Sequence, residues 1–272
     1  MIKRFAVKRI ALCLTFFLII LGVIFILLDI LDIAEDFRLH WSTAVINTIF
    51  ISVVAVFIIY FATKNYLRSS SPETLALGGG ALAFGFAIIL YGWLPNSDLN
   101  TRYTEYDSGV FIASAIYLTG AILSINSQNT PIQKIGLNIL SITAIYIGIV
   151  LIISILTWLA YKDIITFLTH TFSVHFSARD IVQGIAAVFC VSAALIYLKK
   201  YRELRHDIYF WYSLGLILFA AGVIFISRGP LEGRIAWLGR AAEYVSYFYF
   251  LIASLSACKQ SGEKRIANNK DI

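Results

Sequence analysis

Charged residues are scarce in this sequence. Only 14% of its 272 residues are Asp, Glu, Lys or Arg, whereas 59% are hydrophobic, and the mean hydropathy is +0.80. An ordinary soluble domain has about 25% charged residues, so this balance excludes that class. The composition predicts an integral membrane protein whose main surroundings are the lipid bilayer.

Apolar stretches long enough to cross a bilayer recur along the whole chain. A helix needs roughly 20 apolar residues to cross about 30 Å of hydrocarbon. Eight stretches meet this requirement, at 10–28, 42–63, 75–94, 108–125, 135–160, 180–198, 208–227 and 236–258. We therefore expect an all-α bundle of about eight transmembrane helices, in which 1–258 form one helical domain and 259–272 a short basic cytoplasmic tail.

Basic residues predict the orientation of these helices. If the helices alternate from a cytoplasmic N-terminus, fifteen of the 22 Lys and Arg residues fall in cytoplasmic segments and six in external loops. An excess of Lys and Arg on the cytoplasmic side is the pattern of known membrane proteins. Both termini are therefore predicted to be cytoplasmic, and the net charge of +6 reflects topology, not nucleic-acid binding.

The sequence also lacks paired cysteines that could form a disulfide and a lysine in the middle of a span that could bind retinal. The cysteines, Cys13, Cys190 and Cys258, show no paired spacing, so no disulfide is expected. A retinal-binding protein needs a lysine in the middle of a span to form a Schiff base, and every lysine lies at a predicted span edge or in a loop. A retinal protein is therefore not expected.

Histidines give at most a weak metal site. The four histidines lie in predicted loops or at span ends, which does not suit a haem held between facing helices. His170 and His175, with Asp163, are weak candidates for a metal site at the outer surface. The five-residue spacing of the histidines differs from the i, i+4 spacing that aligns two ligands on a helix. We expect no metal and no cofactor.

Motifs of nucleotide and peptide hydrolysis are absent from the sequence. It contains no GxxxxGK[ST] loop to hold phosphates, no GxSxG nucleophile turn and no HExxH zinc helix. We therefore expect a protein that is not an enzyme.

Two charges interrupt the last apolar stretch, "RIAWLGRAAEYVSYFYFLIASLSA" at 234–257. A charge within a transmembrane helix costs about 2.5–3.5 kcal/mol on insertion scales, so such residues usually pair or serve a function. Arg240 and Glu243 share a helical face with the tyrosines that follow. They form either an ion pair that orients the last helix or a polar pocket that senses a ligand or proton. The candidate ligand-binding or switch residues are Arg240, Glu243, Tyr244 and Tyr247, with Trp211 and Tyr212 as walls.

Small residues at helical spacing predict two packing seams. Gly78, Ala81 and Gly85 form one stripe, and Gly184 and Ala187 belong to another. Small residues let helix backbones approach closely inside lipid, where there is no hydrophobic drive between helices. These stripes are candidate helix-packing faces and candidate faces of a homo-oligomer.

The region "WYSLGLILFAAGVIFIS…GRIAWLGRAAEYVSYFYFLIASLSA" at 211–257 resembles a known kind of sensor. It is similar to the end of the multi-span, N-terminal membrane-associated (MASE-like) sensor region of prokaryotic, notably archaeal, PAS-containing sensor histidine kinases. The resemblance implies an eight-span sensor in a prokaryotic plasma membrane whose last helix passes a signal to the cytoplasm. PAS and kinase modules do not follow here, so we expect a chain that acts through a partner such as a histidine kinase, or a module separated from its output.

The leading hypothesis is thus a membrane-embedded signal-input module that detects a small molecule, a lipid or the state of the membrane. Two alternatives remain open. One is a small transporter or permease, and the other is a membrane scaffold protein that binds no ligand.

Overall fold

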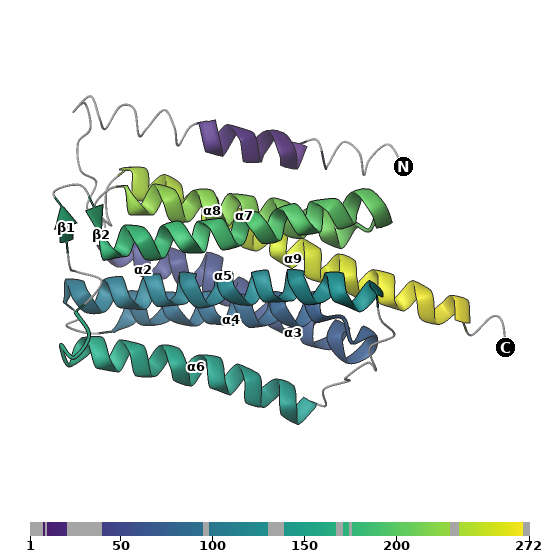
Figure 1. The fold of residues 1–272 in the computed structure, drawn as a ribbon, viewed down its shortest axis with the longest axis horizontal. Coiled ribbons are helices and arrows are strands. Elements are labelled where there is room, and N and C mark those ends of the chain that lie inside the picture. Colours follow the sequence, from purple (N-terminus) through teal and green to yellow (C-terminus); the bar gives the residue numbers. More distant parts are fainter. Residues whose placement is uncertain are drawn as a thin grey trace.

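Long helices that run side by side make up almost all of the structure (Figure 1). This computed structural model describes Lys8 and residues 10–20, 40–94, 98–129, 139–166, 171–173, 176–228 and 234–268. After a short apolar helix, Ile10–Ile20, the elements are α2 (His40–Asn47), the π-helix η1 (Thr48–Val53), α3 (Val54–Ser69), α4 (Pro72–Trp93), α5 (Leu99–Asn129), α6 (Ile139–Tyr161), β1 (Thr171–Ser173), β2 (Phe176–Ser177), α7 (Ala178–Leu204), α8 (Asp207–Ser227) and α9 (Arg234–Asn268).

Seven helices in the described part of the chain are long and apolar enough to cross a bilayer. They coincide with seven of the eight predicted stretches, because α2, η1 and α3 follow one another as a single span, Thr43–Ser69. Only Ile10–Ile20 is described of the predicted first stretch, 10–28, and the remainder lies outside the described residues. The helical class is confirmed, and the seven long apolar helices are consistent with a multi-pass membrane protein. Strands β1 and β2 form a short antiparallel ribbon between α6 and α7.

Local sequence signals set several helix ends. Pro72 occupies the first turn of α4 and Glu73 follows it, where a carboxylate is favourable at the positive end of the helix dipole. The preceding helix, α3, ends at Ser69, and the next residue, Ser70, has a φ of 52° in the left-handed region. Ser177 and Asp180 cap the start of α7 by hydrogen-bonding to each other's backbone amides.

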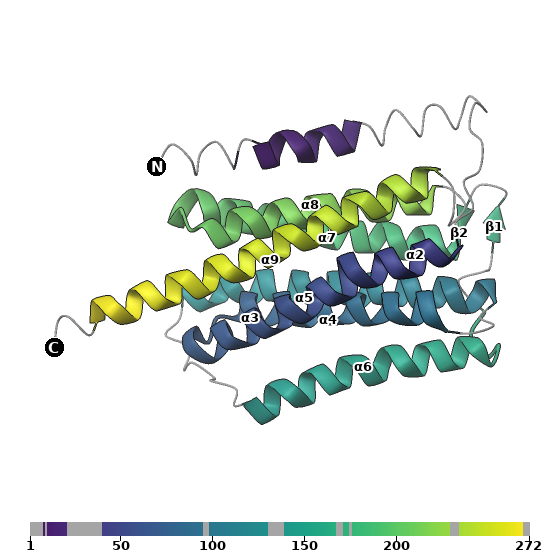
Figure 2. The ribbon, with the colours of Figure 1, turned by 180° about the vertical axis from the view of Figure 1, so that it is seen from behind.

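The helices alternate in direction, so the bundle has two distinct ends. Helices α3 and α4, and helices α7 and α8, are joined at one end, where α9 finishes (Figures 1 and 2). We call this the inner end, because the distribution of basic residues predicts it to be cytoplasmic. At the opposite, outer end lie the β-ribbon and the start of α9 (Figure 1). Lys8 forms an ion pair with Asp207 at the first residue of α8, which places the beginning of the short first helix at the inner end.

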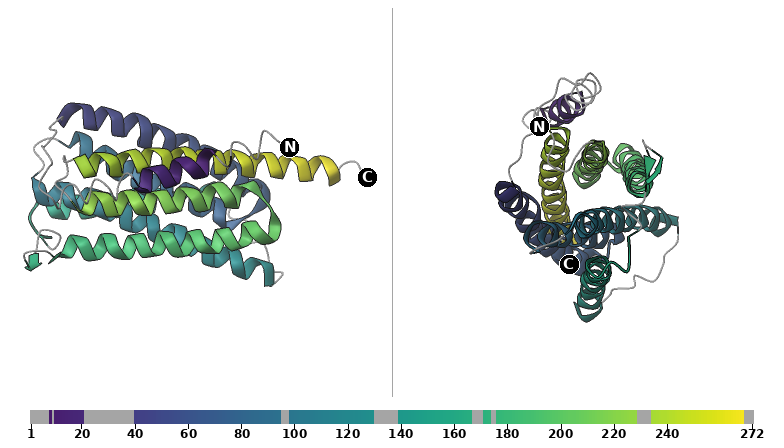
Figure 3. Two further views of the ribbon diagram at one scale, coloured as in Figure 1. Left: turned by 90° about the horizontal axis from the view of Figure 1, so that it is seen from above. Right: turned by 90° about the vertical axis from the view of Figure 1, so that its left-hand side faces the viewer.

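Burial differs strongly among the spans. Of the most apolar part of α8, 72% is buried inside the bundle, compared with 17% for α6. Helix α6 lies at one side of the bundle and packs mainly against α4 and α5 (Figure 3). Among the seven described spans, α8 is thus the most deeply buried and α6 the least.

The predicted seam on α4 exists. A Cβ atom placed on Gly78 would lie 2.5 Å from the Tyr146 hydroxyl, and one placed on Gly85 would lie 2.7 Å from the Ala55 Cβ. Ala81, between the two glycines, is fully buried. Gly78 and Gly85 therefore let α3 and α6 approach α4 more closely than any larger residue would permit.

The seam predicted on α7 needs a correction. Ala187 is buried, but a Cβ atom on Gly184 would meet nothing within 4 Å. Gly184 faces outward, and the buried side of α7 instead carries Gln183, Ala186 and Cys190. A stripe of small residues does not reveal which of two adjacent helix faces is turned inward.

A closer contact joins α8 to α9. A Cβ atom on Gly222 would lie 2.8 Å from the Gly239 carbonyl oxygen, and one on Gly239 would lie 2.7 Å from the Gly222 carbonyl oxygen. The same Gly222 position is 2.9 Å from Cγ of Glu243. The two backbones thus cross at a glycine pair beside the charged residues of α9.

This crossing predicts the effect of two substitutions. Gly222→Ala or Gly239→Ala should lower the free energy of unfolding by about 1–3 kcal/mol, because the added methyl group collides with backbone that cannot rotate away. Unfolding followed by SDS titration in mixed micelles measures this change. Gly184→Ala is the matched control, since its methyl group enters open space, and it should be neutral or slightly stabilising. Equal effects at Gly239 and Gly184 would contradict the proposed crossing.

Candidate functional site

The outer half of α9 carries two buried charges that point into the bundle. Arg240 is 3% exposed and Glu243 is not exposed at all. Nη2 of Arg240 donates a hydrogen bond to the Tyr91 hydroxyl of α4 at 3.0 Å. The hydroxyl of Tyr106 on α5 donates to Oε1 of Glu243 at 2.5 Å. Each charge on α9 is therefore held by a tyrosine from a different helix.

No ion pair joins Arg240 to Glu243 in the described part of the chain, although the two residues are one helical turn apart. The Arg240 guanidinium instead lies 5.4 Å from the centre of the Trp237 ring and 5.9 Å from that of Tyr91, a distance at which aromatic faces attract cations. Nη1 of Arg240 and Oε2 of Glu243 are buried and have no hydrogen-bond partner among the described residues. One donor and one acceptor are thus left for a further group.

Tyr244 connects this region to the π-helix. Its hydroxyl donates to Oδ1 of Asn47 at 2.5 Å, and its ring stacks on Phe50 of η1 with 5.4 Å between ring centres. The widened turns of a π-helix are frequent at functional sites, because they shift side chains out of regular register. Here η1 begins directly after Asn47.

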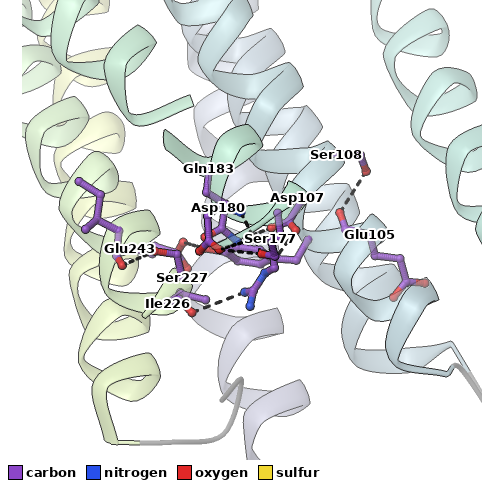
Figure 4. Close-up of polar contacts among 12 residues, drawn as sticks. Glu105, Asp107, Ser108, Ser177, Asp180, Gln183, Ile226, Ser227 and Glu243 are labelled. Carbon is purple, nitrogen blue, oxygen red and sulfur yellow. Dashed lines mark hydrogen bonds and ion pairs between the residues drawn. The ribbon is translucent and has the colours of Figure 1, made fainter. Parts of the chain in front are cut away.

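A second polar group lies beside the first and spans three helices. Nε of Arg179 on α7 is 3.3 Å from Oδ2 of Asp107 on α5, and the Gln183 side chain donates to Oδ1 of the same aspartate. Nη2 of Arg179 also lies 3.5 Å from the carbonyl oxygen of Ile226 on α8. Figure 4 shows Asp107 and Gln183 facing each other, with Glu243 approaching from another helix.

These two groups form what we call the outer polar cluster: Arg240, Glu243, Tyr91, Tyr106, Tyr244, Asn47, Asp107, Arg179 and Gln183. Its two arginines and two carboxylates cancel in formal charge. A buried charge is tolerated only when it is paired or hydrogen-bonded, so this balance explains how four ionisable groups can lie inside one bundle. The cluster draws together α2, α4, α5, α7 and α9.

The other predicted site residues lie elsewhere. Tyr247 is fully buried one turn inward on α9, and its hydroxyl is 3.3 Å from the carbonyl oxygen of Ala81. Trp211 and Tyr212 are buried near the inner end of α8, against Tyr249 and Phe250 respectively. The structure does not bring these two residues to Arg240, because α8 and α9 run in opposite directions and only the end of α8 faces the start of α9.

The weak metal candidates do not come together in the described residues. Asp163 is exposed just after α6, whereas His170 and His175 lie outside the described residues. In the part of the chain that the structure describes, no three His, Cys, Asp or Glu side chains are grouped so that they could hold a metal ion.

Sequence reasoning missed several buried polar residues. Arg179 counted as an external loop residue and Lys200 as a cytoplasmic one, yet both are buried on α7. Nζ of Lys200 donates to the carbonyl oxygen of Ser124 at 2.8 Å, and the Tyr209 hydroxyl donates to Glu73 at 3.0 Å. Each would have been found by continuing the helical periodicity beyond the apolar stretch.

The inner end has its own polar contacts at the surface. Nζ of Lys8 forms an ion pair with Asp207 and donates to the Tyr201 hydroxyl at 3.2 Å. Partial burial lowers the pKa of Lys8, but the hydrogen bonds to Asp207 and Tyr201 outweigh it, so the pKa is raised above its usual value. Lys8 therefore stays charged and ties the first helix to α8.

No family model, curated protein or solved structure matches this chain.

The ion pair of the outer polar cluster predicts a measurable asymmetry. Arg179→Met should lower the free energy of unfolding by about 3–5 kcal/mol, because it leaves Asp107 buried without its cation. Combining Arg179→Met with Asp107→Asn should recover most of this loss, since the amide is neutral and still accepts from Gln183. SDS titration in mixed micelles compares the three proteins. A double variant no more stable than the single one would show that charge compensation is not what the pair provides.

Proposed function

We propose that this protein is a membrane-embedded signal-input module, in which the outer polar cluster responds to a small polar molecule and α9 carries the response to the inner end. The observation that carries the proposal is the continuity of α9. This single helix of 35 residues begins at Arg234 beside the cluster and runs to Asn268. At 1.5 Å per residue it is about 52 Å long, more than the hydrocarbon thickness of a bilayer.

The inner part of α9 extends beyond the rest of the bundle (Figures 2 and 3). A rigid helix that leaves the bundle can present a displacement to another protein. This arrangement agrees with the cytoplasmic signalling partner, such as a histidine kinase, that the resemblance of residues 211–257 implies. The proposed setting is the plasma membrane of a prokaryote, with the inner end in the cytoplasm.

The chemistry of the cluster indicates what kind of molecule would bind. Nη1 of Arg240 offers a donor to an anionic or carbonyl oxygen, and Oε2 of Glu243 offers an acceptor to an amine or hydroxyl group. A small molecule with both kinds of group complements the two atoms. If this molecule replaces Tyr91 as the partner of Arg240 and Tyr106 as the partner of Glu243, α9 loses its hydrogen bonds to α4 and α5. A ligand shifts such an equilibrium only by binding the two states with different affinity.

A native cysteine provides the test. Sγ of Cys258, near the inner end of α9, lies 3.3 Å from the carbonyl oxygen of Phe61 on α3, so its alkylation rate reports the separation of these helices. In a Cys13→Ser background, Glu243→Gln and Arg240→Ala should each change this rate about fivefold or more, as expected for coupling of at least ~1 kcal/mol. Both substitutions alter contacts at the other end of α9.

Ser246→Ala is the matched control for this experiment. Its hydroxyl is buried on the same half of α9 but, among the described residues, bonds only to the carbonyl oxygen of Glu243 in the same helix. We expect the alkylation rate of Cys258 in this variant to equal that of the parent. If the alkylation rates of Cys258 in Glu243→Gln and Arg240→Ala equal that of the control, α9 does not transmit a change in the cluster. That result would contradict the proposal.

A second candidate function, proton transfer across the membrane, is favoured by a column of buried tyrosines. Ring centres are 5.9 Å apart for Tyr117 and Tyr212, 4.4 Å for Tyr212 and Tyr197, and 6.1 Å for Tyr197 and Tyr209. Tyr209 then donates to Glu73 near the inner end. The hydroxyls of Tyr117, Tyr197 and Tyr212 have no hydrogen-bond partner among the described residues, so they are available to internal water.

At its outer side the column approaches the cluster. Tyr117 and Tyr247 both contact Phe250, with ring centres 5.2 and 5.8 Å from it, and Tyr247 lies one turn after Glu243. Acidic side chains at both ends and hydroxyls between them are the elements of a proton relay. This candidate belongs to the transporter class.

Flux measurements separate the two candidates. If the column conducts protons, proteoliposomes should show a proton flux that falls at least about tenfold in Tyr212→Phe, because one hydroxyl of the relay is removed while the ring packing stays. Tyr161→Phe, at an exposed position at the end of α6, should leave the flux unchanged. The absence of any flux above that of empty liposomes would exclude the relay and leave the sensor proposal standing.

A further inference from the structure

Glu105 lies on α5 but outside the outer polar cluster. It projects from the side of the helix opposite Asp107, toward α6 (Figure 4). Glu105 is fully buried, and neither of its carboxylate oxygens has a hydrogen-bond partner among the described residues. The charges of the outer polar cluster already cancel, so this carboxylate adds a negative charge that the cluster does not balance.

Two buried threonine hydroxyls, those of Thr101 on α5 and Thr157 on α6, lie at positions near Glu105 in the register of these helices. Thr101 precedes Glu105 by four residues on α5, which places the two side chains one above the other on the same face. Oγ1 of Thr157 on α6 is buried without a hydrogen-bond partner among the described residues. Oγ1 of Thr101 is also buried and makes no hydrogen bond of ordinary geometry there, although the Asp98 carboxylate, which accepts from the Thr101 backbone amide, lies near it.

The register of α5 and α6 places Thr157 opposite Glu105. The two helices are antiparallel, and Nδ2 of Asn100 donates to the carbonyl oxygen of Ala160 at 3.3 Å. Deeper in the bundle, Ile116 and Ile149 meet at the same point of α4, each 3.5 Å from where a Cβ of Gly79 would lie. Counting along both helices from these two contacts brings Thr157, on the buried face of α6, to the level of Glu105.

Two charged side chains act on Glu105, and their effects oppose each other. Arg102 and Asp98, on the preceding turns of α5, act on it electrostatically with opposite signs. Arg102 is half-buried and Asp98 is exposed, so water screens both more than it screens Glu105. An isolated buried carboxylate is costly unless a cation or a proton compensates it.

We propose that the seam between α5 and α6 binds a monovalent metal cation through Glu105, Thr101 and Thr157. Oxygen atoms of carboxylates and hydroxyls are the ligands that hard cations prefer. A single carboxylate among neutral hydroxyls carries one negative charge, which matches a monovalent cation. The cation would join α5 to α6, the least buried of the seven described spans, and so stabilise its docking. This inference is independent of the function proposed for α9.

Thermal unfolding in nanodiscs tests the site, with sodium chloride as the probe and choline chloride at equal ionic strength as the reference. Sodium should raise the Tm of the native protein by roughly 5 °C in a saturable manner. Glu105→Gln should abolish this increase, because the amide carries no charge. Thr157→Val, which keeps the shape of the side chain, should require about tenfold more sodium for the same increase.

Asp163→Asn is the matched control, because it removes an exposed carboxylate near the end of α6, and asparagine tolerates the φ of 53° at this position. It should respond to sodium as the native protein does. Equal Tm values of the native protein in sodium and choline, or a sodium response that persists in Glu105→Gln, would overturn the proposal. If Glu105→Gln does not fold, binding of radioactive sodium to the native protein and to Thr157→Val decides: saturable binding that weakens in Thr157→Val supports the site, and no binding overturns it.

Discussion

The need to compensate two charges on a membrane-embedded helix governs the arrangement of this bundle. Arg240 and Glu243 lie inside α9, where lipid and apolar side chains would leave them without partners. Tyr91 and Tyr106 supply the hydrogen bonds from α4 and α5. Gly222 then brings the α8 backbone close enough to exclude lipid from this side of α9. The crossing of α8 and α9 and the position of the outer polar cluster therefore serve the same purpose, which is to keep Arg240 and Glu243 hydrogen-bonded and away from lipid.

The same arrangement connects the outer end to the inner end. Helix α9 is continuous from the cluster to the extension beyond the bundle, whereas the first long span is interrupted by the π-helix η1. Tyr244 contacts this interruption through Asn47 and Phe50. The continuous helix α9 and the irregular helix η1 thus meet at the outer polar cluster. A change in the hydrogen bonds of the cluster can therefore move α9 relative to the first long span. The proposed sensor function depends on this conversion.

Much of the architecture follows from hydropathy, because crossing a bilayer demands a length of apolar helix that few other structures need. Seven spans, the start of α4 at Pro72 and the close approach at Gly78 were all predictable. The charges Arg240 and Glu243 were identifiable because their cost inside a span is high and their spacing places them on one face.

The remainder of the cluster escaped prediction for a physical reason. Apolar stretches at 108–125 and 180–198 mark only the apolar part of α5 and α7, but both helices continue into polar sequence that the bundle covers. Asp107 and Arg179 lie in these continuations, so they resembled loop residues. Trp211 does not lie beside Arg240, although the two residues are on consecutive helices. Helices α8 and α9 are antiparallel, so the start of α9 with Arg240 packs against the end of α8, whereas Trp211 lies near the start of α8. Gly184 shows that residue size alone does not select the inward face.

The central claim, that the outer cluster sets the position of the inner part of α9, is tested most directly by a distance measurement. Spin labels at Lys259→Cys on α9 and Leu67→Cys on α3, in a protein without native cysteines, report the separation of exposed sites near the inner end. The account predicts that Glu243→Gln shifts or broadens the distance distribution measured by pulsed electron paramagnetic resonance, while Ser246→Ala does not. Identical distributions in all three proteins would contradict it.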